Sequence, residues 1–146
     1  MKITINIDEE LADTHIAVSC GQLTPEIERL IATIRIFNMQ LTGKREEEVF
    51  LLDAAEVLYV ETVDKKTFLY TKEAEYESGL KLYELEEQLE HAEFVRINKS
   101  CLMNMRHVIS LKADINRRIA ATMSNQEQLM ISRQYAEAVR ERLGVK

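Results

Sequence analysis

After residue 48 the chain consists of short runs of β-branched and aromatic residues, separated by turn-forming or charged residues. The runs with this pattern are 49–52, 57–63, 67–71, 74–77, 94–97, 108–113, 116–123 and 129–131. Runs of this length and composition are typical of strands joined by short turns into antiparallel sheets. The pattern therefore predicts a mainly β fold with short flanking helices, which is an α+β class.

A few stretches have helical instead of β periodicity. Leucines recur on one face of 80–90, and a last helix is expected over 133–143 with Ser132 as its N-cap. Thr-Pro at 24–25 begins a further helix, because threonine caps and proline fits the first turn. One turn of helix is expected at 102–105. These helices are expected to flank the sheets.

The first part of the chain differs from the rest. Residues 1–44 are expected to form a small ββα module, joined by a charged linker at 41–48 to a domain over 45–146. Its two strands are predicted at 2–7, where apolar and polar residues alternate, and at 15–19. Such a module is too small to bury the apolar face of its helix, so we expect a homodimer. The expected dimerisation residues are Ile27, Leu30, Ile31 and Ile34.

The net charge of −6 is unevenly distributed along the chain. Residues 1–44 carry four basic and six acidic residues, residues 45–98 carry six and fifteen, and residues 99–146 carry nine and four. A positive end on an acidic body suits a protein that meets phosphate with one edge only. The alternative is that the acidic residues lie on the solvated faces of one helix and say nothing about partners.

Several functional classes lose support at this point. The sequence has no glycine-rich phosphate loop and no HExxH or GxSxG motif, and its three histidines lack ligand spacing. No enzyme activity, metal, cofactor or small-molecule substrate is therefore expected. Cys20 and Cys101 are isolated and are expected to be buried thiols of a reducing compartment. No apolar run matches a membrane span or a secretory signal, so the expected location is the cytoplasm.

Three segments carry the functional information. VLYVE occupies 57–61, FVRINKSCLMN occupies 94–104 and ISRQY occupies 131–135. The second segment leaves a polar Asn-Lys-Ser cluster at 98–100, where asparagine suits an adenine edge and lysine suits guanine or phosphate. Arg133 follows a capping serine at a helix start, where free N–H groups favour phosphate and the guanidinium can pair with guanine.

These three segments, in this order, resemble the LytTR DNA-binding domain of bacterial transcription regulators over about residues 45–146. The resemblance implies elongated antiparallel sheets with small flanking helices. It also implies sequence-specific binding of double-stranded DNA by loops at strand ends, which enter successive major grooves and bend the site. The DNA-binding residues that it implies are Lys65, Lys66, Thr67, Asn98, Lys99, Ser100, Arg106 and Arg133.

The implied contacts divide into two kinds. Lys99 and Arg133 are expected to read base edges. The residues expected to contact phosphates and set the register are Lys65, Lys66, Ser100 and Arg106. The family often has histidine where Asn98 stands, which leaves the base preference there open. Arg96 and Asn104 are expected to be structural, and Glu61 is expected to pair with a nearby basic side chain.

Two further inferences concern the whole protein. Residues 1–44 are too few for the phosphoacceptor receiver domain that many LytTR proteins carry, and the paired sites of the family suit a two-fold dimer. The alternative function is a non-enzymatic adaptor or antagonist that docks a basic protein on its acidic 45–98 surface. A small hydrolase or transferase is a third, poorly supported reading.

A structural test separates the first two functions. DNA binding requires the implied DNA-binding residues to converge on one basic edge, whereas an adaptor does not.

Overall fold

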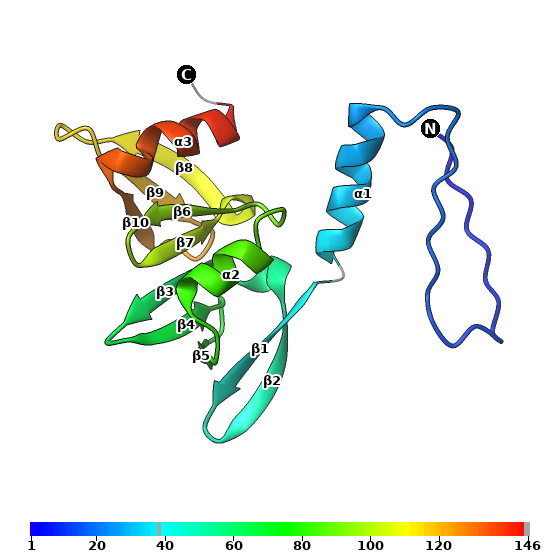
Figure 1. The fold of residues 1–146 in the computed structure, drawn as a ribbon, viewed down its shortest axis with the longest axis horizontal. Coiled ribbons are helices and arrows are strands. Elements are labelled where there is room, and N and C mark those ends of the chain that lie inside the picture. The colour runs from blue at the N-terminus through cyan, green and yellow to red at the C-terminus, as the bar shows by residue number, and fades with distance from the viewer. Residues whose placement is uncertain (38, 145–146) are drawn as a thin grey trace.

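The computed structural model describes residues 1–37 and 39–144, and the strands of this part form two antiparallel sheets (Figure 1). The seven-stranded sheet contains β1 (Gln40–Arg45), β2 (Glu48–Asp53), β3 (Tyr59–Val63), β4 (Lys66–Tyr70), β5 (Glu75–Ser78), β6 (Phe94–Asn98) and β7 (Cys101–Asn104), in the order β2-β1-β5-β4-β3-β7-β6. The three-stranded sheet contains β8 (Val108–Ala113), β9 (Ile119–Met123) and β10 (Gln128–Ile131). The helices are α1 (Pro25–Phe37), α2 (Leu82–Gln88) and α3 (Arg133–Leu143), with short 3-10 helices η1 (Ala54–Glu56) and η2 (Met105–His107). The predicted mainly β, α+β class is confirmed.

The larger sheet buries apolar side chains on both faces. Because successive strand residues point to opposite faces, Tyr59 and Val60 of β3 belong to different core clusters. The cluster with Val60 includes Leu69 of β4 and Leu85 of α2. The cluster with Tyr59 includes Ile97 of β6 and extends to β9, β10 and α3. The sheet is therefore a central layer between α2 and the smaller sheet.

Two polar contacts tie the sheets together. The Tyr59 hydroxyl donates to Glu127 Oε2 at 2.6 Å, and burial followed by the Glu127 carboxylate raises the tyrosine pKa. His107 also connects the two sheets. Its Nε2 donates to the carbonyl of Ala55, in η1 between two strands of the larger sheet (2.6 Å), and its Nδ1 lies 3.0 Å from the hydroxyl of Ser124, which follows β9 of the smaller sheet. These contacts join segments far apart in sequence, so they fix how one sheet sits on the other.

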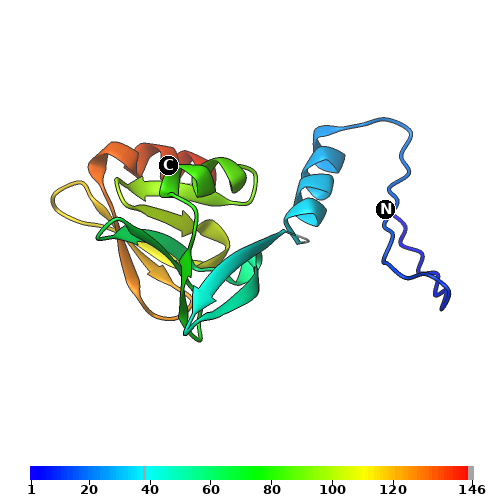
Figure 2. The same ribbon diagram turned by 60° about the horizontal axis from the view of Figure 1, so that its bottom comes forward.

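The two predicted N-terminal strands are wrong, since the described part of the chain has no strand before Gln40. Residues 2–7 leave Ile5 81% exposed, and a two-stranded hairpin with no apolar surface to cover is marginal in water. The helix start is confirmed: Thr24 Oγ1 accepts a hydrogen bond from the Ile27 N–H (3.3 Å). Figures 1 and 2 show α1 and the preceding segment to one side of the sheets.

The expected linker at 41–48 is also wrong, because most of it forms β1 and its turn to β2. Gly43 lies within β1. It pairs with Phe50, and a Cβ atom at Gly43 would lie 2.6 Å from the Tyr76 Cβ, so only glycine fits this close approach. A domain boundary at residue 44 would cut β1, and the sheet instead begins at Gln40.

Two further local predictions fail. The apolar run at 102–105 is mostly strand β7, because its backbone pairs with β3 on one side and β6 on the other. Asn104 is structural as expected: Nδ2 donates to the Val57 carbonyl (2.9 Å), and Oδ1 caps η2. Cys20 is exposed in a segment without regular structure, whereas Cys101 is buried as expected, and burial raises its pKa to about 12.

The part of the chain that the structure describes contains no helix long and apolar enough to cross a membrane. Within the same residues no group of three or more His, Cys, Asp or Glu side chains is arranged to hold a metal ion.

Candidate nucleic-acid interface

Three loops that are distant in sequence meet at one edge of the molecule. They are the β3–β4 turn, the β6–β7 turn and the first residues of α3. The Thr62 N–H donates to the Ser100 carbonyl (2.8 Å), which joins the first two loops. The Ser132 N–H donates to the Ile97 carbonyl (2.9 Å), which fixes the start of α3 beside the end of β6. We name these three loops the loop edge.

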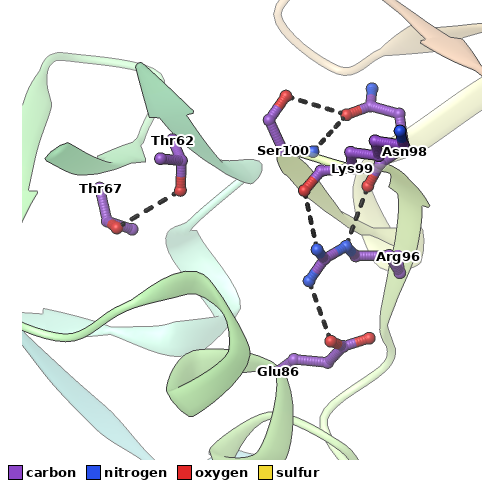
Figure 3. Close-up of polar contacts among 7 residues, drawn as sticks. All are labelled: Thr62, Thr67, Glu86, Arg96, Asn98, Lys99 and Ser100. Carbon is purple, nitrogen blue, oxygen red and sulfur yellow. Dashed lines mark hydrogen bonds and ion pairs between the residues drawn. The ribbon is translucent and has the colours of Figure 1, made fainter. Parts of the chain in front are cut away.

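The β3–β4 turn presents two lysines at the loop edge. Asp64 and Lys65 both have positive φ, 49° and 68°, the pattern of a two-residue type I′ hairpin turn. Lys65 and Lys66 are exposed, and neither forms an ion pair with any residue of 1–37 or 39–144. Thr67 differs from them: it is 5% exposed, and its hydroxyl lies 3.5 Å from that of Thr62 (Figure 3). The lysines are therefore free to meet an anion, whereas Thr67 is a packed residue.

The β6–β7 turn is held by its own asparagine. Asn98 Oδ1 accepts from the Ser100 N–H (2.8 Å) and from the Ser100 hydroxyl (3.1 Å), as Figure 3 shows. Its Nδ2 lies 3.4 Å from the Met130 carbonyl. Both ends of the Asn98 amide are thus engaged in shaping the turn. Lys99 is left exposed at the tip.

Arg96 supports the same turn from beneath. Its Nε donates to the Asn98 carbonyl (2.9 Å), and its Nη2 donates to the Lys99 carbonyl (2.7 Å). Its Nη1 lies 3.0 Å from Glu86 Oε1 of α2, so a single guanidinium links the turn to the helix (Figure 3). The structural role expected for Arg96 is confirmed by these contacts.

The two remaining implied residues, Arg133 and Arg106, lie at opposite ends of the β6–β7 hairpin. Arg133 is the first residue of α3, is exposed and lies beside the end of β6. Arg106 follows β7, so it lies at the other end of the β6–β7 hairpin, with its Nε 3.6 Å from Glu93 Oε2. The structure therefore gathers every implied DNA-binding residue except Arg106 at the loop edge.

Sequence reasoning missed one part of this edge. A hollow of about 490 Å³ between the loops is lined also by Thr62, Lys81 and Tyr83. Lys81 directly precedes α2, and no local pattern in the sequence indicates that the fold brings it near Lys65 and Lys99. Only the packing of α2 on the sheet creates this neighbourhood.

Glu61 behaves differently from its expected role. Among the described residues it has no basic partner within ion-pair distance. Burial, and then the charge of Glu127, raise the pKa of its carboxyl group. Its cross-strand partners are Phe68 and Cys101, so neither residue paired with it is basic.

Comparison with known protein families shows which family this domain belongs to. The model of the LytTr DNA-binding domain matches residues 47–144. The chain belongs to the LytTR family. The matched range covers β2–β10, α2 and α3, and therefore all three loops of the loop edge.

Individual relatives agree with this assignment. The LytTr DNA-binding domain of a Bacillus cereus response regulator superposes with a TM-score of 0.68 and 28% identity, covering 72% of this chain and 96% of that domain. Two Staphylococcus aureus proteins named as HTH-type transcriptional regulators, from strains MSSA476 and MRSA252, are 23% and 22% identical to the LytTR chain. Each alignment covers 99% of both chains. In the described part of this LytTR chain strands separate each helix from the next, so the HTH of that name has no counterpart there.

Proposed function

We propose that this LytTR protein is a bacterial transcription regulator that binds specific double-stranded DNA sites through the loop edge, in the cytoplasm and without catalysing a reaction. The observation that carries the proposal is the convergence of exposed, unpaired lysines from two turns with Arg133 from a third segment. The family match and the regulator names of the relatives support it. Lysine and arginine are the side chains that phosphates and guanine edges attract most strongly.

The side chains of the edge divide into contacting and positioning residues. Lys99 and Arg133 stand exposed at the loop tips, which suits bidentate or single contacts to base edges. Lys65 and Lys66 suit phosphate contacts that set the register. The side-chain amide of Asn98 is hydrogen-bonded within the β6–β7 turn, so we assign Asn98 the role of holding Lys99 in place.

The acidic remainder of the chain favours a single orientation on DNA. Residues 45–98 carry fifteen acidic and six basic residues, and two of the four lysines among them, Lys65 and Lys66, are at the loop edge. A duplex that approaches any other face of this region meets like charge, which lowers the rate of unproductive encounters. The overall charge of −6 is therefore compatible with DNA binding by one edge.

Binding to selected DNA tests the proposal. Genomic fragments retained by the full chain are sequenced, and affinities for a selected and an unrelated duplex are measured at several salt concentrations. We expect Lys99→Ala and Arg133→Ala each to lose about 1–3 kcal/mol of discrimination between the two duplexes. Lys72→Ala, an exposed lysine beyond the other end of β4, is the matched control. Equal discrimination by the wild type and a Lys99→Ala, Arg133→Ala double variant would reject this assignment.

We also propose that residues 1–37 join two copies of the chain. The apolar side chains at the start of this segment are exposed to solvent: Ile3, Ile5 and Ile7 are 80%, 81% and 89% exposed. The residues of α1 proposed for the contact, all only partly buried, are Ile27, Leu30, Ile31 and Ile34. Alternating residues that have no partner strand among residues 1–37 and 39–144 suit pairing with the same segment of a second copy. A two-fold dimer would place two loop edges on paired DNA sites.

Sedimentation measurements test the dimer. We expect a concentration-dependent monomer–dimer equilibrium that Ile31→Asp shifts at least about tenfold toward monomer, because the charge would be buried at the contact. Arg29→Asp, on the exposed side of the same helix, is the control and keeps the dimer. A monomer at all concentrations, unchanged by Ile31→Asp, would remove the dimer while leaving DNA binding by the loop edge intact.

A further inference from the structure

The hollow between the loops of the loop edge has the lining of an anion site. Its basic lining residues are Lys65, Lys81, Arg96 and Lys99. Thr62 and Thr67 contribute hydroxyl-bearing side chains to it, and Tyr83, which is 60% exposed, lines it from α2. None of the described residues that line the hollow is acidic. Ammonium groups together with hydroxyls are the combination that binds phosphate oxygens.

The positive charge of this hollow is not neutralised. Lys65, Lys81 and Lys99 form no ion pair with any residue between 1 and 37 or between 39 and 144. They come from three different elements, namely the β3–β4 turn, the residue before α2 and the β6–β7 turn. Three like charges facing one hollow repel one another, and this repulsion is relieved when an anion enters.

Two acids of α2, Glu84 and Glu86, are engaged in contacts of their own. Glu86 is paired with Arg96 at 3.0 Å, so this pair adds little net charge (Figure 3). Glu84 accepts a hydrogen bond from the Lys81 backbone N–H (3.2 Å), which ties its carboxylate to the chain. The Lys81 ammonium group is not part of either contact and stays available.

We propose that the hollow seats one backbone phosphate of the DNA, held by Lys81 and by the Tyr83 hydroxyl in addition to Lys65. This proposal rests on DNA binding by the loop edge and adds a fourth segment, the start of α2, to it. The site lies between two loops of that edge, so a duplex that reaches Lys99 passes over the opening. The contact is to the phosphate and is blind to base sequence.

The salt dependence of binding tests the role of Lys81. For Lys81→Ala we expect the slope of log affinity against log salt to fall by about 1, and affinity at 0.15 M salt to fall about 5-fold. The loss is equal for selected and unrelated duplexes, unlike the loss at Lys99 and Arg133. Tyr83→Phe weakens both duplexes by a smaller factor.

Two controls separate charge from folding and from general electrostatics. Lys81→Arg keeps the positive charge and is expected to keep the slope, so a loss in Lys81→Ala cannot come from misfolding alone. Lys72→Ala removes an exposed lysine outside the hollow and is expected to leave the slope unchanged. Duplexes with a single neutral methylphosphonate locate the contact, because the position that weakens the wild type weakens Lys81→Ala by a smaller factor.

The outcomes distinguish this inference from the function on which it rests. A wild type without salt-dependent DNA binding overturns both. If the wild type binds DNA and Lys81→Ala leaves the slope of log affinity against log salt unchanged, only the proposed phosphate contact in the hollow is overturned. Inorganic phosphate and chloride are also compared at equal ionic strength by thermal melting. Phosphate-specific stabilisation that Lys81→Ala abolishes, with DNA binding unaffected, would assign the hollow to a free anion and overturn the DNA contact.

Discussion

Two hairpin turns of the larger sheet have the same backbone form and opposite chemistry. In the β1–β2 turn Glu46 and Glu47 have φ values of 49° and 70°, and in the β3–β4 turn Asp64 and Lys65 have 49° and 68°. Both fit the type I′ pattern. The first turn ends the outer hairpin of the sheet, whereas the second lies against the β6–β7 turn. Backbone geometry alone therefore does not determine which turn meets DNA; charge and neighbours do.

Removing the charges of each turn should give the largest contrast. Lys65→Ala combined with Lys66→Ala is expected to lower DNA affinity by up to about 30-fold at 0.15 M salt, since each lost phosphate contact reduces the salt slope by about 0.9. Glu46→Ala combined with Glu47→Ala is expected to stay within about 3-fold, because that turn carries no phosphate contact. Fluorescence anisotropy at several salt concentrations measures both. Equal losses would mean that the two turns are not functionally different.

Packing within the acidic hairpin gives a second contrast, in stability. Gly43→Ala places a methyl group against Tyr76 and is expected to cost about 1–3 kcal/mol of unfolding free energy. Gly79→Ala meets no atom within 4 Å and is expected to be neutral within about 0.5 kcal/mol. Urea denaturation compares them. DNA affinity of folded Gly43→Ala should remain at the wild-type value, and a large loss would show that the outer hairpin takes part in binding.

The smallest expected effect is on stability and concerns Glu61, which lies in β3, the strand that leads into the basic β3–β4 turn. Burial and Glu127 raise its folded pKa, so ionisation is disfavoured in the folded state. The resulting loss of stability is absent below the unfolded pKa and develops as pH rises through the folded pKa. Glu61→Gln should therefore stabilise the protein at neutral pH by less than about 1 kcal/mol, because the group is partly solvated, and should be neutral at strongly acidic pH. Glu46→Gln in the exposed turn is the control; the opposite pH trend would contradict the assignment.

Elements with local signals were predictable from the sequence. The helix over 133–143 agrees with α3, because the apolar spacing that predicts it lies within the helix itself. Ser132 occupies the N-cap position as expected, but its side chain forms no capping hydrogen bond. The strand at 94–97 and the strand at 108–113 agree closely with β6 and β8 for the same reason. The family resemblance located the loops, and the structure brings these loops together but places Arg106 at the other end of the β6–β7 hairpin.

Elements that depend on distant partners were not predictable. Residues 102–104 are apolar in a way that suits a helical turn or a strand, and pairing with β3 and β6 makes them a strand. Residues 2–7 alternate like a strand but have no partner in the described chain. At the site, burial of Thr67, engagement of Asn98 and the approach of Lys81 all follow from tertiary contacts. No spacing along the chain encodes them.

Amide hydrogen exchange of the full chain, with and without a selected duplex, tests the central claim most directly. DNA bound by the loop edge predicts slowed exchange in the β3–β4 turn, the β6–β7 turn, the start of α3 and the residues before α2. It predicts no change in the β1–β2 turn. Slowed exchange in the acidic β1–β2 turn, with the three loops unchanged, would contradict the account.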